Sequence, residues 1–363
     1  MTNVGHKAIH QVIVGASDGD AITSMALQVR TALRQEVESD IFARWVFSDS
    51  LQGDVKLLDQ MPGSHACDLL LYHSSYGLPA LTSLLLSRSE PLALSYHNLT
   101  PWQFYLDYNP EFALGLHWGH HELELIRSRV ILAMADSSFN AADLISHGYG
   151  DVKVVPVGVD PERLLAQPTD SALLRNLNES NPHGYVLAVA QILHHKRIEQ
   201  LIEAVHLCNS VHDVDLGLVI AGVSRQPAYM NGLIAHGKSL PNCRVRFLGA
   251  VTDRDLATAF RGARLFLSMS DHEGFSIPPL EAMSFGIPVI VKGAGAVPET
   301  VGDGALVLPA TASIALAAEA IFEVAFNDAT RKRLILQGLQ RVKSILALDS
   351  AQAARTLLMD AIK

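Results

Sequence analysis

The sequence has little cysteine and no long apolar run, and each shortage excludes a class of protein. Its three cysteines, Cys67, Cys208 and Cys243, lie far apart with no Cys-x-x-Cys pair. That spacing excludes a disulfide framework and a zinc ribbon. No stretch of about 18 consecutive apolar residues occurs, so no membrane-spanning helix is predicted. The first residues also lack the apolar core of a secretion signal. We therefore expect a cytoplasmic protein, with peripheral contact to the inner face of the membrane left open.

Positive charge is also scarce. The net charge is -9, and the first 163 residues carry 10 Lys and Arg against 19 Asp and Glu. Because nucleic-acid binding needs clustered Lys and Arg, we predict no nucleic-acid partner. The loop after the first apolar run contains Gly15 and Gly19 but lacks the Gly-x-Gly-x-x-Gly pattern, so a redox dinucleotide is not predicted either.

The chain is long and apolar enough to form two hydrophobic cores. It has 363 residues, 49% of them hydrophobic and 18% charged, and a domain typically holds about 100 to 200 residues. Short apolar runs alternate with segments of helical period, which indicates parallel sheets covered on both faces. The predicted strands lie at 9–14, 43–47, 67–72, 91–96, 130–134 and 152–157, and then at 185–190, 214–222, 243–249, 263–269, 287–291 and 305–309.

A polar stretch from Pro161 to Gly184 separates the two series of strands. We therefore predict an α/β protein of two tandem, doubly wound, Rossmann-like domains with a cleft between them. The predicted domains are 1–163 and 164–345, and a last helix over 346–363 is expected to pack back on the first domain. In such sheets, ligands bind beyond the carboxyl ends of the strands, so residues just after strands are the candidates for function.

The segment 271–290, DHEGFSIPPLEAMSFGIPVI, follows a predicted strand and is the most informative part of the chain. Its two adjacent prolines fit the first turn of a helix, where a missing N–H costs little. Backbone N–H groups at such a helix start suit an anion such as a diphosphate. Carboxylates on either side could accept hydrogen bonds from sugar hydroxyls. The candidate ligands are the amides of Gly274, Phe275 and Ser276 and the side chains of Glu273 and Glu281.

A second candidate group, Gln191 to Arg197, follows the strand predicted at 185–190. Lys196 and Arg197 lie where a strand ends and a helix begins. Two cations at a helix start oppose the helix dipole, so we expect an anion to compensate them. A diphosphate would do so. An exposed, solvated Lys–Arg pair is the alternative.

The first half of the chain has candidates at its own strand ends. Gly19 follows the first predicted strand, where a glycine lets the backbone approach a ligand, and Asp20 is placed to cap the next helix. His97 ends the strand at 91–96, and its ring offers both a donor and an acceptor. Asp18 and Asp20 alone are too weak a pair for a divalent ion, so no metal site is predicted.

The string from Glu273 to Pro288 resembles the Glu-x7-Glu signature of retaining glycosyltransferases of family four, which have the two-domain GT-B fold. Further matching motifs extend the resemblance over nearly the full chain: Gly19 to Ile22, Tyr72-His73, Tyr96 to Pro101, Asp136 to Asn140 and Val297-Pro298-Glu299. The resemblance implies metal-independent transfer of a hexose, with retention, from a nucleotide diphosphate sugar to a hydroxyl of a glycan or lipid-linked acceptor. The implied role is in cell-surface polysaccharide assembly.

The resemblance also implies which residues of the second domain hold the donor. Glu281 would hold the ribose, Glu273 the donor sugar, and Lys196 the phosphates and the leaving group. The family carries an arginine where this chain has Gln191, so Arg197 is the expected replacement. The amides after Glu273 would complete the phosphate site.

For the first domain, the resemblance implies contacts to the donor sugar and to the acceptor. His97 would lie near the donor sugar and the bond that breaks, and Gly19 would approach the donor. Asp20, His73 and Trp102 are the candidates for the acceptor side.

Two other functions remain open. Because Gln191 stands where the family has an arginine, the protein could instead be a non-catalytic partner that binds nucleotide sugars or glycans. A nucleotide-sugar epimerase could also use the same fold. In each case we expect a nucleotide sugar as co-substrate or ligand and no further cofactor. The sequence does not determine whether the donor carries UDP or GDP, nor its sugar, the acceptor, the linkage or the oligomeric state.

Overall fold

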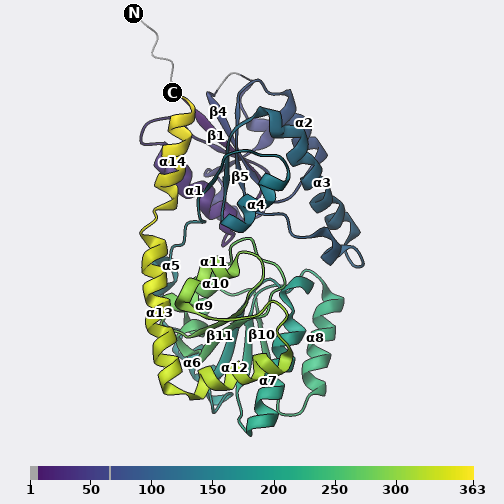
Figure 1. Ribbon diagram of the computed structural model, residues 1–363, viewed down its shortest axis with the longest axis vertical. Helices are drawn as coiled ribbons and strands as arrows, with labels where there is room; N and C mark the ends of the chain where they lie inside the picture. The colour runs from purple at the N-terminus through teal and green to yellow at the C-terminus, as the bar shows by residue number, and fades with distance from the viewer. Residues whose placement is uncertain (1–6, 65–66) are drawn as a thin grey trace, which may run out of the picture. The chain divides into compact units, whose positions relative to one another are not determined.

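Two parallel β-sheets, one in each half of the chain, organise the computed structural model, which describes residues 7–64 and 67–363 (Figure 1). The chain divides into two units. Unit 1 runs to Gly158 and also includes Leu348–Lys363, and unit 2 is Val159–Ala347. Among the described residues, no helix is both long and apolar enough to span a bilayer.

Unit 1 is built on a seven-stranded sheet in the order β3-β2-β1-β4-β5-β6-β7. The inner strands are buried along their length, as expected for a sheet covered on both faces. The strands are β1 (Ile9–Ala16), β2 (Ile41–Val46), β3 (Val55–Leu57), β4 (Leu69–Ser74), β5 (Leu92–Tyr96), β6 (Val130–Ala135) and β7 (Val152–Val154). The helices are α1 (Ala21–Leu33), α2 (Pro79–Ser87), α3 (Pro110–Ile126), α4 (Ser138–Ser146) and α14 (Ser350–Ala361).

Unit 2 repeats the same winding with six strands in the order β10-β9-β8-β11-β12-β13. Its strands are β8 (Tyr185–Val189), β9 (Gly217–Ala221), β10 (Arg244–Gly249), β11 (Leu265–Ser268), β12 (Val289–Lys292) and β13 (Leu306–Leu308). Its helices are α5 (Glu162–Leu165), α6 (Ser171–Glu179), α7 (Ile198–His212), α8 (Pro227–Ser239), α9 (Asp253–Gly262), α10 (Pro278–Ser284), α11 (Val297–Val301), α12 (Ile314–Phe326) and α13 (Asp328–Leu346). Helices α7 and α12 pack together and share one buried apolar cluster with the sheet.

Each strand predicted from the sequence is present, with ends shifted by a few residues. The prediction missed β3, whose three residues, Val-Lys-Leu, are too few to show an alternating pattern. β3 lies at the edge of the sheet and pairs only with β2 among the described strands.

The boundary between the units lies at Gly158, not at Arg163 as the sequence suggested. The difference arises because α5 packs on α9, where Arg163 forms an ion pair with Asp253. At the other end, α13 runs to Leu346 within unit 2. The last helix, α14, begins after Asp349 and packs against α1 of unit 1, where Arg355 forms an ion pair with Glu36 (Figure 1).

We expect Gly77→Ala to destabilise unit 1. A Cβ at Gly77 would lie 2.3 Å from the backbone nitrogen of Gly119 in α3, and a backbone cannot yield without moving the helix. The expected loss is about 1 to 3 kcal/mol, the usual cost of overpacking. Gly232→Ala in α8 is the matched control, because nothing lies within 4 Å of a Cβ there. The control should be neutral or stabilising by up to about 1 kcal/mol. Denaturant unfolding measures both variants, and equal stabilities would contradict the prediction.

Candidate functional site

The candidate site in unit 2 lies where the order of the strands reverses. β8 and β11 are neighbours in the sheet, and the loops after such a pair of strands leave a crevice at their carboxyl ends. Lys196 follows β8 in the short turn η5 (His194–Lys196), and Glu273 follows β11. The Lys196 Nζ lies 2.7 Å from the Glu273 Oε1, and the two side chains are 16% and 13% exposed. Two residues that the sequence proposed for the same ligand are thus in contact.

The loop that carries Glu273 is held in place by the segment after β12. The backbone N–H of Ala296 donates to the Glu273 carbonyl at 2.9 Å, and the Thr300 hydroxyl donates to the Phe275 carbonyl at 2.6 Å. Gly295 has φ +59, and a Cβ there would lie 2.3 Å from the Glu273 carbonyl oxygen. This close approach requires glycine. The sequence did not predict these supports.

The start of α10 limits where amide donors can come from. Pro278 and Pro279 occupy its first two positions, and neither has an N–H. Amide donors to an anion at this helix start must therefore come from the loop before it, which contains Gly274, Phe275 and Ser276. Ser276 has φ 78, so the chain turns sharply at this point.

Glu281 lies in α10 and is 8% exposed. The Arg163 Nη2 lies 3.2 Å from its Oε1, and the Arg163 Nη1 lies 2.5 Å from the Asp253 Oδ1. Burial raises the pKa of Glu281, and the positive charge of Arg163 opposes this rise. The sequence did not associate Arg163 with this site.

Arg197 already has anionic partners within the protein, which corrects the expectation that a ligand must compensate it. Its Nε donates to Asp271, its Nη1 lies 3.5 Å from the Glu199 Oε1, and Lys292 also pairs with Asp271. Burial opposes ionisation of Asp271, but the two cations outweigh it and lower its pKa. Gln191 is exposed in the same loop.

His195, beside Lys196, contributes no positive charge. It is 4% exposed, and burial lowers its pKa to about 2. Its backbone carbonyl accepts a hydrogen bond from the N–H of Asp271 at 2.7 Å, which ties the loop after β8 to the loop after β11.

In unit 1, His97 and His73 form the middle of a buried chain of hydrogen bonds. The His97 Nδ1 lies 2.9 Å from the Asp136 Oδ2, and its Nε2 lies 2.9 Å from the His73 Nδ1. The His73 Nε2 lies 2.9 Å from the Gln11 Oε1. His73 is 1% exposed and the side chain of His97 is 3% exposed. Both rings therefore have their nitrogens occupied, and neither offers one to a ligand in this conformation.

The chain of hydrogen bonds also fixes where its protons lie. Gln11 donates its amide to the Ala26 carbonyl, so its oxygen accepts from the His73 Nε2. Burial holds the pKa of His73 well below its usual range, so His73 is neutral and its Nδ1 accepts from His97. One more proton must lie between the His97 Nδ1 and Asp136.

Of the remaining unit 1 candidates, Asp20 and Trp102 have partners within the protein. Asp20 caps α1, and its carboxylate accepts from the Thr23 N–H at 2.8 Å. Gly19 has φ +72, which favours glycine, and nothing lies within 4 Å of a Cβ there. Trp102 is partly exposed and contacts His117 edge to face.

The described residues include no group of three His, Cys, Asp or Glu side chains that could hold a metal ion.

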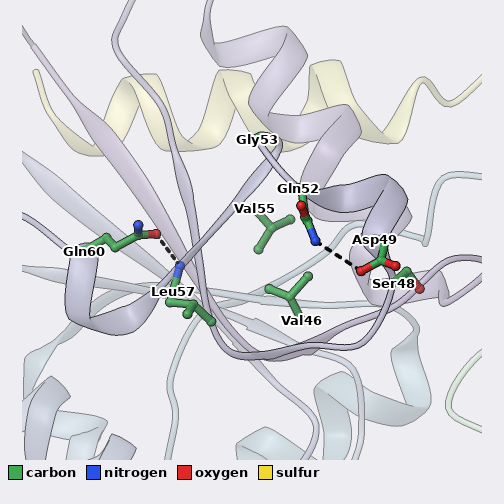
Figure 2. Close-up of a pocket in the computed structure, with 8 residues that line it drawn as sticks. All are labelled: Val46, Ser48, Asp49, Gln52, Gly53, Val55, Leu57 and Gln60. Atoms are coloured by element: carbon green, nitrogen blue, oxygen red, sulfur yellow. Dashed lines mark hydrogen bonds between the residues drawn. The ribbon is translucent and has the colours of Figure 1, made fainter.

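A pocket in unit 1 lies at the ends of β2 and β3 (Figure 2). Asp49 is its only charged lining residue, and no cation lines it, so it does not suit phosphates. Its lining residues are Val46, Ser48, Asp49, Gln52, Gly53, Val55, Leu57 and Gln60.

Residues 172–341 match the family model of glycosyl transferases group 1. The matched part of the chain is thus similar to that family, and it includes Lys196, Glu273 and Glu281. The match confirms, over these residues, the resemblance predicted from the sequence.

Individual relatives agree with the family match. O-antigen chain mannosyltransferase B of Escherichia coli is 31% identical over 161 residues, which cover 44% of this chain and 42% of that protein. MMP α-(1→4)-mannosyltransferase of Mycolicibacterium hassiacum is 32% identical over 170 residues, which cover 46% of this chain and 38% of that protein. The chain thus matches less than half the length of these curated relatives.

Solved structures extend the likeness to the whole fold. Sucrose-phosphate synthase of Thermosynechococcus elongatus has a TM-score of 0.76 at 19% identity, covering 98% of this chain and 100% of that one. Anabaena HepE in complex with UDP-glucose has a TM-score of 0.71 at 17% identity, with 98% and 100% covered. WaaG, a glycosyltransferase involved in lipopolysaccharide biosynthesis, has a TM-score of 0.67 at 14% identity, with 96% and 98% covered. The predicted GT-B fold is confirmed.

We expect Asp136→Ala to destabilise unit 1, because it leaves the buried His97 Nδ1 without its Asp136 partner. Leaving a buried polar group without a hydrogen bond typically costs about 1 to 3 kcal/mol. Asp107→Ala is the control, because Asp107 is exposed. Denaturant unfolding gives the two stabilities. Equal stabilities of Asp136→Ala and the control would show that this hydrogen bond does not support the fold.

Proposed function

We propose that this protein is a glycosyltransferase that moves a hexose from a nucleotide diphosphate sugar to a hydroxyl of a glycan or glycolipid acceptor. The observation that carries the proposal is the contact of Lys196 with Glu273 at the carboxyl ends of β8 and β11, within the part of the chain that matches the family. A cation beside a carboxylate, next to backbone amides, suits a sugar joined to a diphosphate. We propose a role in cell-surface polysaccharide assembly.

We propose mannose as the transferred sugar. The names of both relatives given above state mannosyl transfer, which supports this choice. HepE was solved with UDP-glucose, which supports a nucleotide diphosphate as the carrier but leaves the base open between GDP and UDP.

The proposed mechanism retains the configuration of the sugar and relies on electrostatic stabilisation of the leaving diphosphate. Lys196 and the amides after Glu273 would stabilise the negative charge that develops as the bond to the sugar breaks. Before the donor binds, Glu273 neutralises Lys196. A diphosphate would compete for Lys196 and release Glu273 to accept hydrogen bonds from the sugar hydroxyls. No covalent nucleophile is needed.

Transfer should depend on Glu273 more strongly than nucleotide binding does. We expect purified protein to release nucleoside diphosphate from GDP-mannose or UDP-glucose when a mannose-terminated oligosaccharide is present. Glu273→Ala should lower this transfer about a hundredfold, similar to the loss of one stabilising group in a transition state. Binding of the free diphosphate should be unchanged or tighter, because Lys196 loses its partner. Calorimetry and a single-turnover assay measure the two effects.

Equal losses of binding and transfer in Glu273→Ala would place Glu273 on the nucleotide instead. Binding of the donor without transfer to any acceptor would favour the non-catalytic alternative. Isomerisation of the donor without acceptor would favour an epimerase.

We propose that the reaction needs no metal ion, because Lys196 and backbone amides are assigned to the diphosphate. Exhaustive treatment with EDTA should therefore leave the single-turnover rate unchanged. The assay should follow one turnover, because product release can respond to metal even when chemistry does not. Loss of the single-turnover rate, restored by Mn²⁺ or Mg²⁺, would contradict this assignment.

A further inference from the structure

Arg163 joins two carboxylates that come from different helices of unit 2. Its Nη1 lies 2.5 Å from the Asp253 Oδ1 at the start of α9, and its Nη2 lies 3.2 Å from the Glu281 Oε1 in α10. The planar guanidinium presents these donors in a fixed geometry, which a lysine could not reproduce. Arg163 therefore restrains the direction in which the Glu281 carboxylate points.

The segment that carries Arg163 is itself fixed on α9. Leu164 is fully buried, and the Arg261 Nη2 donates to the carbonyls of Leu165 and Gln167 at 2.9 and 2.7 Å. The Gln167 amide donates to the Arg163 carbonyl at 3.0 Å. These contacts fix the backbone that carries Arg163, and the side chain, which is 37% exposed, is held by its two carboxylate partners.

Glu281 needs such a support because it is buried and negatively charged. The charged groups that act on it are Arg163 from α5 and Asp253 from α9, and burial is the largest influence. Burial and Asp253 raise the pKa of Glu281, whereas Arg163 lowers it. The described residues donate no hydrogen bond to the Glu281 Oε2.

We propose that Arg163 is a positioning residue for donor binding, which holds the Glu281 carboxylate ionised and correctly oriented for the ribose hydroxyls of the nucleotide. The inference rests on the proposed function, because it takes the ligand of Glu281 to be a ribose. Arg163 does not touch the ligand. It acts through Glu281 alone, and its effect therefore depends on pH and on the presence of the ribose hydroxyls.

The test compares the full chain with Arg163→Met, using GDP, UDP and their 2′,3′-dideoxy analogues in calorimetric titrations. The substitution should weaken binding of the ribonucleotides about tenfold, which matches the difference in hydrogen-bond free energy between a charged and a neutral acceptor. The affinity for the dideoxy analogues should be unchanged. The loss should grow as the pH falls from about 8 to about 6, because the carboxyl without Arg163 binds a proton at higher pH. Arg254→Gln is the matched control, because Arg254 lies next to Asp253 in α9 and pairs with Asp170 instead of Glu281.

Two further variants separate positioning from folding. Arg163→Lys keeps the charge, so the pH profile should return toward wild type while some affinity stays lost. Asp253→Asn removes a negative charge but keeps an oxygen that can accept from Arg163. Because Asp253 raises the pKa of Glu281, this variant should keep its affinity to lower pH than the wild type.

Three outcomes would overturn the inference. Wild-type affinity of Arg163→Met at every pH would show that Glu281 needs no support. Tighter binding by Arg163→Met would show that Arg163 competes with the ribose. Equal weakening of the ribonucleotide and the dideoxy analogue would show a general effect on the fold. If Glu281→Gln also binds every nucleotide as the wild type does, the ribose assignment in the proposed function fails first.

Discussion

Buried charge at one edge of a parallel sheet is the constraint on which the candidate site depends. The carboxyl ends of β8, β11 and β12 bring together loops with several acidic and basic side chains. Removing an ion from water costs several kcal/mol unless an opposite charge and hydrogen bonds replace the lost hydration. Lys196 with Glu273, and Asp271 with Arg197 and Lys292, meet that requirement from within the protein. The loops are therefore ordered before any ligand arrives, which lowers the entropic cost of binding one.

The sequence predicted the fold well because the fold is encoded locally. Alternation of apolar runs with helical segments gives a parallel sheet wherever it occurs, and a strand end marks where side chains can meet a ligand. Glu273 and Lys196 could be found in this way because each follows a strongly apolar strand. The edge strand β3 and the short helix α5 could not be found, since their stability comes from neighbours in space.

The partners of the site residues could not be predicted for a related reason. Arg163 and Glu281 are 118 positions apart, and only the winding of the chain brings them together. The partners of the unit 1 histidines were not predicted either. His73 and His97 stand at strand ends as a ligand-binding pair would, yet their nitrogens are satisfied by Gln11, Asp136 and each other. A histidine at a strand end has two ring nitrogens to satisfy, and the sequence does not show whether protein or ligand does so.

Charge balance around the unit 2 site also determines how an anionic donor could be recognised. Among the described residues, the ion pairs at this site join four cations to five carboxylates, namely Arg163, Lys196, Arg197 and Lys292 against Glu199, Asp253, Asp271, Glu273 and Glu281. This cluster has no excess of positive charge, so its long-range field would not steer a diphosphate toward it. Recognition must then rest on short-range contacts: backbone amides, Lys196 once Glu273 releases it, and the Glu281 carboxylate. Such contacts depend on orientation far more than on net charge, which is why the residues that orient Glu273 and Glu281 matter as much as the two carboxylates themselves.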